Sequence, residues 1–237
     1  MTSRSWRLSV VACLLALVGA LVVVSPPAPA DAAARPVVAV VGDSYTAAWG
    51  AVHKRFPPTT EGAWWRTTAQ QLGWTPGTIV ASPGGGYVKR GDNGTFAQAL
   101  RARPIAPGTD YVLVQGGLND EAQSPSAVMA GVREVLSIIR AQAPGAVPIV
   151  IGGFLPSPST VTPGYVQVAR AIGDSRATGT TRYMTGFMCS FSLATDGRHP
   201  DGAGHRTIGR FVAWHIAHGL DNAPPLHKDP TGSFYTV

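Results

Sequence analysis

The stretch Pro36-Val-Val-Ala-Val-Val-Gly-Asp-Ser-Tyr-Thr46 decides the fold class of this chain. Its first six residues are apolar throughout and include four valines. A short continuous run of this kind predicts a strand that is buried on both faces, as strands of parallel sheets are. Ligands bind beyond the carboxyl ends of the strands in such sheets. Ser44, which follows directly, therefore stands where a functional side chain is expected.

Four later short runs, rich in Val, Ile, Tyr and Thr, are also predicted strands. They span residues 78–81, 111–115, 148–152 and 182–185. Between them lie longer stretches with helical spacing. The alternation of short strands and helices predicts an α/β protein, a three-layer α/β/α sandwich around a parallel sheet.

The helical stretches have recognisable boundaries. In Ser126–Gln142, apolar residues recur at intervals of three and four, Pro125 precedes the stretch and Pro144-Gly145 ends it. Thr162-Pro163 and Asp201-Gly202 mark the starts of two further helices.

Two of the predicted strand ends offer a nucleophile and a backbone donor. Ser44 could attack through its hydroxyl and bind an oxyanion through its N–H, or could simply cap a helix. After the second strand, Pro83-Gly-Gly-Gly86 lets a backbone N–H approach a substrate closely, or forms an ordinary flexible loop.

Two further segments offer the remaining groups of a hydrolytic site. Asn119 follows the third strand and carries a neutral amide donor, although Asn-Asp also suits a plain turn. Asp196 lies three residues before His199 on a short loop. There its carboxylate can accept the Nδ1–H of the imidazole and leave Nε2 for a serine, or it can cap a helix.

In order and spacing, these four segments resemble the four sequence blocks of the SGNH, or GDSL, hydrolase superfamily. The resemblance implies a flavodoxin-like sheet of about five parallel strands and needs no cofactor or metal. It implies that Ser44 is the nucleophile, His199 the base and Asp196 its orienting partner. It also implies an oxyanion hole of the Ser44 N–H, the Asn119 side chain and a glycine N–H, for which Gly84 matches best and Gly85 is the alternative.

The sequence departs from the family pattern in the second block, where Ile79 occupies the position that often holds Asn. The α/β-hydrolase lipases offer a poorer match. They use a G-x-S-x-G turn with a distant acid and histidine, whereas Ser44 lies in Gly-Asp-Ser-Tyr-Thr.

The chain divides into three predicted parts. Residues 1–32 read as a secretory signal peptide, with Arg4 and Arg7 before an apolar run and Ala-x-Ala sites after it. Residues 33–221 form the hydrolase-like domain, and residues 222–237 a surface tail. We therefore expect a secreted or cell-envelope protein whose mature form has no membrane span.

The composition of the chain limits the classes of binding partner that are expected. Charged residues make up 14% of the chain, the formal net charge is +6 and no run of Lys or Arg occurs, so nucleic-acid binding is not expected. Cys189 is the single cysteine after the signal segment and is expected to be buried rather than reactive.

Several other polar and aromatic residues have expected places of their own. Asp43 is expected to brace its loop, and His205 to be packed or solvated. The residues Tyr87, Lys89 and Arg90 could line the acyl or alcohol pocket, although a solvated loop is the expected place for them. The tryptophans Trp64, Trp65 and Trp74 are expected in the core or at its rim, with a platform for sugars as the alternative.

The sequence thus predicts a serine hydrolase that cleaves acyl or acetyl carboxylic esters, on small molecules or on envelope glycans or lipids, through an acyl-serine intermediate. We expect it to be a monomer. The alternative is a non-catalytic, polysaccharide-binding envelope protein on the same fold.

Overall fold

The computed structural model describes residues 34–48, 62–175, 181–184 and 187–219, and four residues in two short strands near the C-terminus. The described fold lies in the compact unit Arg35–Val237. The predicted signal segment lies outside the described residues, and so does most of the predicted tail. The assignments for these parts stay predictions.

A five-stranded parallel sheet forms the centre of the fold. Its strands are β1 (Val37–Gly42), β2 (Thr75–Ala81), β3 (Tyr111–Gln115), β4 (Val147–Ile151) and β6 (Arg182–Met184). They lie in the order β2-β1-β3-β4-β6, and every neighbouring pair is parallel. This is the flavodoxin-like order, in which the chain winds outward in both directions from β1 and β3. The fold class expected from the sequence is confirmed.

The strand boundaries differ most at β2. This strand begins at Thr75, three residues before the predicted start, and includes Pro76. Proline lacks an N–H, but β2 is an edge strand, where one side of the backbone needs no ladder partner. Two short pairs were not predicted, one of β5 (Phe154–Leu155) with β7 (Phe187–Met188) and one of β8 (His227–Lys228) with β9 (Phe234–Tyr235).

The three predicted helices are present and are capped as their sequences indicate. They are α3 (Pro125–Gln142), α4 (Pro163–Asp174) and α5 (Gly202–His218). The side chains of Ser124, Thr162 and Asp201 each accept a hydrogen bond from a backbone N–H in the first turn. Two helices were not predicted, α1 (Trp64–Leu72) and α2 (Phe96–Ala102).

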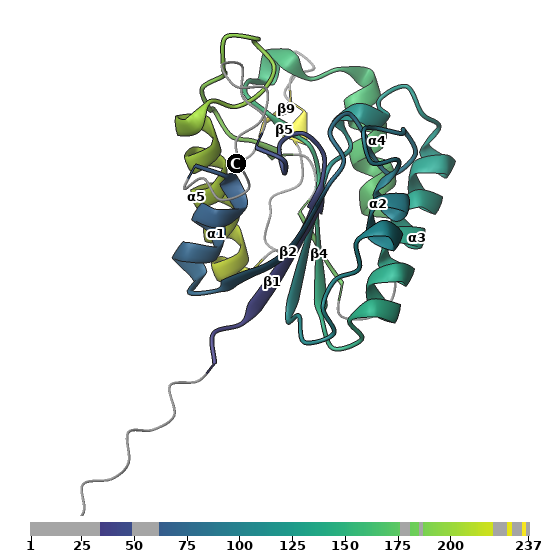
Figure 1. The fold of residues 1–237 in the computed structure, drawn as a ribbon. Coiled ribbons are helices and arrows are strands. Elements are labelled where there is room, and N and C mark those ends of the chain that lie inside the picture. Colours follow the sequence, from purple (N-terminus) through teal and green to yellow (C-terminus); the bar gives the residue numbers. More distant parts are fainter. Residues whose placement is uncertain are drawn as a thin grey trace, which may run out of the picture. The chain divides into compact units, whose positions relative to one another are not determined.

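The helices cover the two faces of the sheet, with α1 and α5 on one face and α2, α3 and α4 on the other (Figure 1). Alternate residues of β1 point to the two sides. Val38 and Val40 pack with Trp64 on the α1–α5 side, and Ala39 and Val41 pack in the α2–α4 core. In the described part of the chain, no helix has the length and apolarity that crossing a membrane requires.

Candidate active site

The polar residues singled out in the sequence meet at the carboxyl edge of the sheet. Ser44 follows β1, and Asn119 lies in a short 3-10 helix, Leu118–Asp120, that follows β3. Strands β1 and β3 form the point at which the winding of the sheet reverses direction, where ligands bind in open α/β sheets. Asp196 and His199 reach the same edge from the loop that precedes α5.

Ser44, His199 and Asp196 form a continuous chain of hydrogen bonds. The distance from Ser44 Oγ to His199 Nε2 is 3.0 Å. On the other side of the ring, His199 Nδ1 lies 2.7 Å from Asp196 Oδ2. Each imidazole nitrogen faces one partner, so the Nδ1–H tautomer presents the Nε2 lone pair to the serine hydroxyl.

The Asp196–His199 loop is held by its own carboxylate. Asp196 Oδ1 accepts the backbone N–H groups of Arg198 and His199, each at 2.9 Å, and Gly197 adopts a φ of 64°. The hydrogen bond from His199, with those backbone groups, lowers the pKa of Asp196 to about 2. The Asp196 side chain is nevertheless 36% exposed. Local hydrogen bonds, rather than burial, therefore keep this carboxylate charged and oriented.

The turn that carries Ser44 is supported from below by buried polar groups. Asp43 is buried and accepts the Tyr45 N–H at 2.9 Å, in agreement with the expected bracing role. Burial raises its pKa to about 7, against the opposing effect of hydrogen bonds from the Tyr45 backbone and the Gln115 side chain. Thr46 Oγ1 donates to Gln115 Oε1 at 3.1 Å, which ties the turn to the end of β3.

Tyr45 connects the turn to the loop on the other side of the site. Its hydroxyl donates to the carbonyl of Arg198 at 2.8 Å, and its ring centroid lies 5.9 Å from that of His199. Burial raises the pKa of this phenol, so it remains a donor. Sequence reasoning missed this role, because no local pattern relates two residues that lie 153 positions apart.

The glycine loop is clamped by Asp120. This buried carboxylate accepts the backbone N–H groups of Tyr87, Val88 and Lys89 at 2.8, 3.1 and 2.8 Å. A Cβ at Gly86 would collide with the same carboxylate, so glycine is required there. Tyr87 is only 2% exposed, and its expected place on a solvated loop is therefore wrong. Its backbone is drawn inward by Asp120, and its ring packs edge-on against Phe96.

The three glycines differ in the use of their N–H groups. Gly85 donates to the Ser82 carbonyl, and Gly86 donates to the Lys89 carbonyl. Among the described residues, the Gly84 N–H has no such acceptor, and the space around a Cβ built at Gly84 is open within 4 Å. Gly84 has a φ of 72°, which glycine adopts without strain. Asn119 Nδ2 donates to the Gly85 carbonyl at 2.9 Å, which places Asn119 against this loop.

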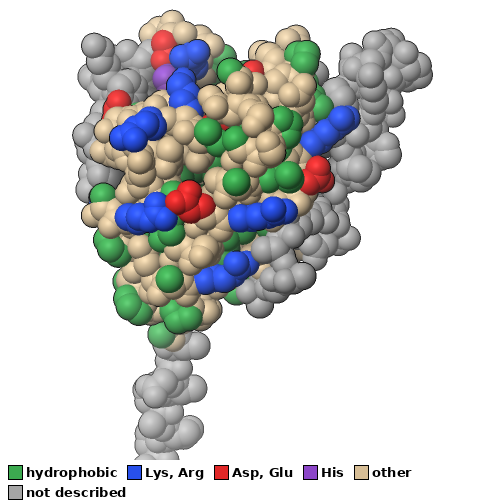
Figure 2. All heavy atoms as spheres, turned by 90° about the vertical axis from the view of Figure 1, so that its right-hand side faces the viewer, with side chains coloured by type: hydrophobic (Ala, Val, Ile, Leu, Met, Phe, Trp, Pro, Cys, Tyr) green, Lys and Arg blue, Asp and Glu red, His purple; other side chains and the backbone are tan. Residues whose placement is uncertain are grey.

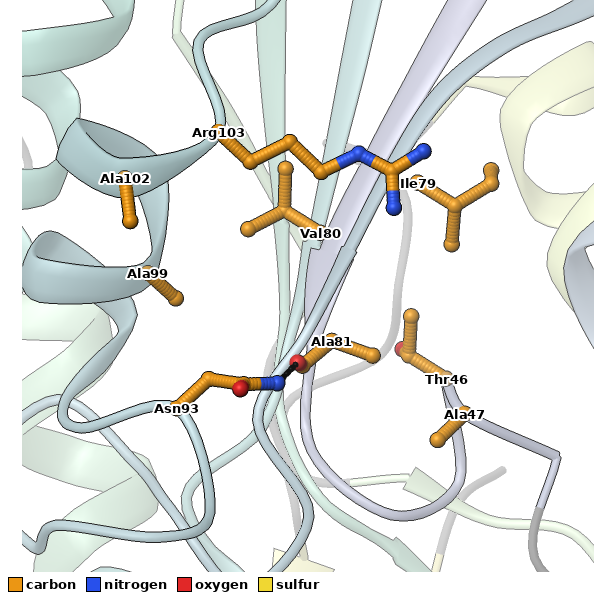
Figure 3. Close-up of a pocket in the computed structure, with 9 residues that line it drawn as sticks. All are labelled: Thr46, Ala47, Ile79, Val80, Ala81, Asn93, Ala99, Ala102 and Arg103. Carbon is orange, nitrogen blue, oxygen red and sulfur yellow. Dashed lines mark hydrogen bonds between the residues drawn. The ribbon is translucent and has the colours of Figure 1, made fainter. Parts of the chain in front are cut away.

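A cavity of about 300 Å³ lies beside the Ser44 turn, between β2 and α2 (Figure 3). Thr46, Ala47, Ile79 and Ala99 are among its lining residues, and the Arg103 side chain extends across it toward Ile79. Neither Ser44 nor His199 belongs to this lining. The cavity is therefore separate from the hydrogen-bonded chain of the site.

Other titratable residues lie apart from this site. Cys189 is buried as expected, and burial raises the pKa of its thiol to about 12. His205 is fully buried on α5. Within the described ranges, no group of three His, Cys, Asp or Glu side chains has an arrangement that could hold a metal ion.

Solved structures similar to this fold include several carbohydrate esterases. A family two carbohydrate esterase from Clostridium thermocellum, in complex with cellohexaose, superposes with a TM-score of 0.59 and 18% identity, over 83% of this chain and 67% of that one. A carbohydrate acetylesterase family member from Sinorhizobium meliloti superposes with a TM-score of 0.57 and 17% identity, over 78% of this chain and 99% of that one. A family 2 carbohydrate esterase with a carbohydrate-binding domain from Myceliophthora fergusii superposes with a TM-score of 0.57 and 20% identity, over 83% of this chain and 69% of that one.

The sequence of this chain matches a family model but no curated protein. No curated protein sequence matches this chain. The model of the GDSL-like lipase/acylhydrolase family, by contrast, matches residues 40–207, a span that includes Ser44, Gly84, Asn119, Asp196 and His199. That span covers more than half of the chain and the whole of the described site, and the chain therefore belongs to the GDSL-like lipase/acylhydrolase family of carboxylic ester hydrolases.

Proposed function

We propose that this protein removes short acyl groups, acetyl foremost, from glycans outside the cell, with Ser44 as the nucleophile. The observation that carries the proposal is the chain of contacts Ser44 Oγ–His199 Nε2 and His199 Nδ1–Asp196 Oδ2, at 3.0 and 2.7 Å. In an ester hydrolase family, this arrangement has one clear chemical use, the activation of the serine hydroxyl.

The reaction proceeds in two halves. His199 Nε2 takes the Ser44 proton as Oγ attacks the carbonyl carbon of the ester, and the imidazolium returns that proton to the departing alcohol oxygen. The product of this half is an acyl ester on Ser44. Water then attacks the acyl carbonyl with His199 again as base, which releases the carboxylic acid and restores the Ser44 hydroxyl. Asp196 stabilises the imidazolium in both halves through Nδ1–H.

Three donors are assigned to the oxyanion: the Ser44 N–H, the Gly84 N–H and the Asn119 side-chain amide. The Gly84 N–H supports this assignment, because Gly85 and Gly86 already donate within their loop. One hydrogen of the Asn119 amide is directed to the Gly85 carbonyl, and this orients the amide. Its second hydrogen is the one assigned to the oxyanion.

Two observations support a glycan ester. The structural neighbours include carbohydrate esterases, one of them crystallised with cellohexaose. The His199 and Asp196 side chains are 14% and 36% exposed, so the catalytic groups lie near the surface, where an acyl group on a polymer can approach them. An extracellular or envelope location follows from the signal segment predicted at residues 1–32.

The test combines a fluorophosphonate label with a series of p-nitrophenyl esters of two, four, eight and sixteen acyl carbons. The wild-type protein should be labelled and should prefer the two-carbon ester. Ser44→Ala should lose labelling and reduce kcat by about 10³-fold or more. Ser137→Ala removes the same hydroxyl from the exposed surface of α3 and should behave as wild type.

Two outcomes would overturn the proposal. Labelling that persists in Ser44→Ala would remove Ser44 from its role. A wild-type protein that hydrolyses neither these esters nor an acetylated glycan would favour the non-catalytic, polysaccharide-binding alternative.

A further inference from the structure

A groove of about 780 Å³ lies between α1 and α5, apart from the residues of the proposed reaction. Arg66, Thr67 and Gln70 line it from α1, Arg206 and Arg210 line it from α5, and Trp74 lies at the end nearest the start of β2. Figure 1 shows the two helices side by side on one face of the sheet. The volume falls within the range of about 300–1,000 Å³ that is usual for ligand sites.

The walls of the groove are fixed by a close contact between the two helices. A Cβ at Gly209 would collide with the Trp64 carbonyl and the Thr67 side chain, so only glycine permits this approach. Thr68 Oγ1 lies 3.0 Å from the carbonyl oxygens of both Trp64 and Gly209. Because Gly209 lies between Arg206 and Arg210, the contact that joins the helices also sets where both arginines emerge.

The groove has an excess of positive charge. Its lining includes three arginines and, among the described residues, no aspartate or glutamate. The nearest acid in sequence to Arg206 is Asp201, which feels the charge of Arg206 but lies outside the groove lining. Its Oδ1 accepts the Ser192 hydroxyl at 2.6 Å and the Gly204 N–H at 2.7 Å. Arg66 is also held in place, with its guanidinium carbon 5.6 Å from the centroid of the Trp65 ring.

The opposite helix layer has no comparable concentration of charge. Figure 2 shows the face formed by α2, α3 and α4, where basic side chains are spread out and acidic ones lie between them. On this face Arg101 and Glu134 form an ion pair at 2.7 Å. The positive groove is thus a local feature of the α1–α5 face and not a general result of the net charge of +6.

We propose that this groove binds an acidic glycan through its carboxylate groups. A guanidinium is a planar fork of donors that matches a carboxylate, and Arg206 and Arg210 are one helical turn apart on the same face of α5. Trp74 offers an apolar ring edge for a sugar, fixed by stacking on Tyr111 with ring centroids 4.3 Å apart. Gln70 and Thr67 add neutral donors and acceptors suited to sugar hydroxyls.

The groove also has a direct spatial relation to the Asp196–His199 loop. Gly202, the first residue of α5, comes three residues after His199, and a Cβ at Gly62 in the groove lining would lie 4.0 Å from it. From Gly202 to Arg210 the helix extends about 12 Å. A polymer bound along the groove would therefore approach the catalytic loop. This link to ester cleavage rests on the proposed function, whereas the binding itself does not.

The test measures the affinity of the full protein for a hexamer of galacturonic acid, with maltohexaose as the neutral probe, by calorimetry at low ionic strength. Neither probe contains an ester, so the result is independent of catalysis. We expect binding of the acidic hexamer only, and a Kd at least about tenfold weaker in Arg206→Gln/Arg210→Gln, because two charge-assisted contacts are lost.

A matched control has the same change in net charge on the other helix layer. Arg133→Gln/Arg170→Gln removes two exposed arginines from α3 and α4 and should change the Kd less than about threefold. Gln70→Glu, a single exposed change in the groove, should also weaken binding. Melting temperatures identify any variant that is not folded.

Three results would overturn the proposal. The first is equal weakening in the two double variants, which would make the effect one of net charge alone. The second is binding of polyphosphate as tight as that of the acidic hexamer, which would mean that the groove does not recognise sugar. The third is the absence of binding of the hexamer by the wild-type protein.

Discussion

The site has two sides that are held in place by different means. The sheet side consists of the turn after β1 and the loops after β2 and β3, and its supporting carboxylates, Asp43 and Asp120, are 1% and 0% exposed. The loop side is the segment from Asp196 to Pro200, whose carboxylate is exposed. On the sheet side, burial raises the pKa of Asp43 to about 7, whereas on the loop side the hydrogen bond from His199 lowers that of Asp196 to about 2.

This difference indicates a division of work. Buried carboxylates that accept several backbone N–H groups are expensive to remove, because those groups lose their partner in the interior. Replacing an exposed carboxylate changes the free energy of unfolding little, because water can accept hydrogen bonds from the N–H groups that lose their partner. Changes on the loop side should therefore affect turnover without affecting stability, and changes on the sheet side should affect stability first.

The largest effect is expected for Asp196→Asn on the loop side. The amide can still accept the two backbone N–H groups at Oδ1, but its Nδ2 donates toward His199 Nδ1 and favours the wrong tautomer. We expect kcat for a short p-nitrophenyl ester to fall about 10³- to 10⁴-fold. Urea unfolding should show little change in the free energy of unfolding.

The control for this change is Asp174→Asn, at the exposed end of α4, which should retain full turnover. A loss of stability comparable to the loss of turnover in Asp196→Asn would contradict the separation between the two sides.

The second prediction concerns Asp120→Ala on the sheet side. Three backbone N–H groups, those of Tyr87, Val88 and Lys89, would lose their acceptor. We expect the free energy of unfolding to fall by about 3 kcal/mol, measured by urea titration. Asp110→Ala, which removes one acceptor from the more exposed Val37 N–H, should cost about 1 kcal/mol or less. Equal costs in the two variants would show that burial is not the deciding factor.

The sequence predicts those strands, helices and site residues that local patterns mark. The buried runs at β1, β3 and β4 were placed to within one residue, because continuous β-branched strands have a strong signal. Helix α1 was missed, because its buried side includes Trp64, Trp65 and Thr68, and no regular aliphatic spacing marks it. Ser44 and His199 were singled out because four segments together resemble the blocks of the family, and the structure brings Ser44 Oγ and His199 Nε2 to 3.0 Å.

Contacts between distant segments were not predictable in the same way. The clamp of Asp120 on the glycine loop joins residues 31 to 33 positions apart, and its consequence, the burial of Tyr87, was therefore missed. The clustering of the groove arginines was likewise not predictable from the sequence. Arg66 and Arg206 come together only because α1 and α5 pack against each other at Gly209.

The third prediction tests the buried charge of Asp43 through pH. The pKa of Asp43 is raised from a usual value of 3.8 to about 7 in the folded state. The contribution of this carboxyl to stability is therefore at its full value below pH 3.8. That contribution is lost as pH rises toward 7, because the unfolded chain releases the proton earlier. The lowered pKa of Asp196 acts in the opposite sense, above pH 3.8, but this carboxylate is exposed and its contribution to stability is small.

The measurement compares urea unfolding of the wild type and of Asp43→Asn, which mimics the neutral carboxyl, at intervals between pH 4.5 and 7.5. Relative to the variant, the wild type should lose up to about 1.4 kcal/mol per pH unit in this window. Parallel stability curves would mean that Asp43 is not protonated in the folded protein at these pH values.

The smallest effect is expected for Tyr45→Phe, at the residue that joins the two sides. Tyr45 belongs to the sheet side, yet its hydroxyl fixes the Arg198 carbonyl of the loop side at 2.8 Å. Loss of one such bond costs about 0.5–1.5 kcal/mol. Because Tyr45 acts as a positioning residue, its replacement should lower kcat by about 2- to 12-fold and leave KM for a small ester nearly unchanged. Tyr165→Phe loses an equivalent bond, from its hydroxyl to the Gly153 carbonyl at 2.9 Å, and should lower stability but not kcat. If both variants lower stability and neither lowers kcat, the loop side needs no support from the sheet side and is held by Asp196 alone.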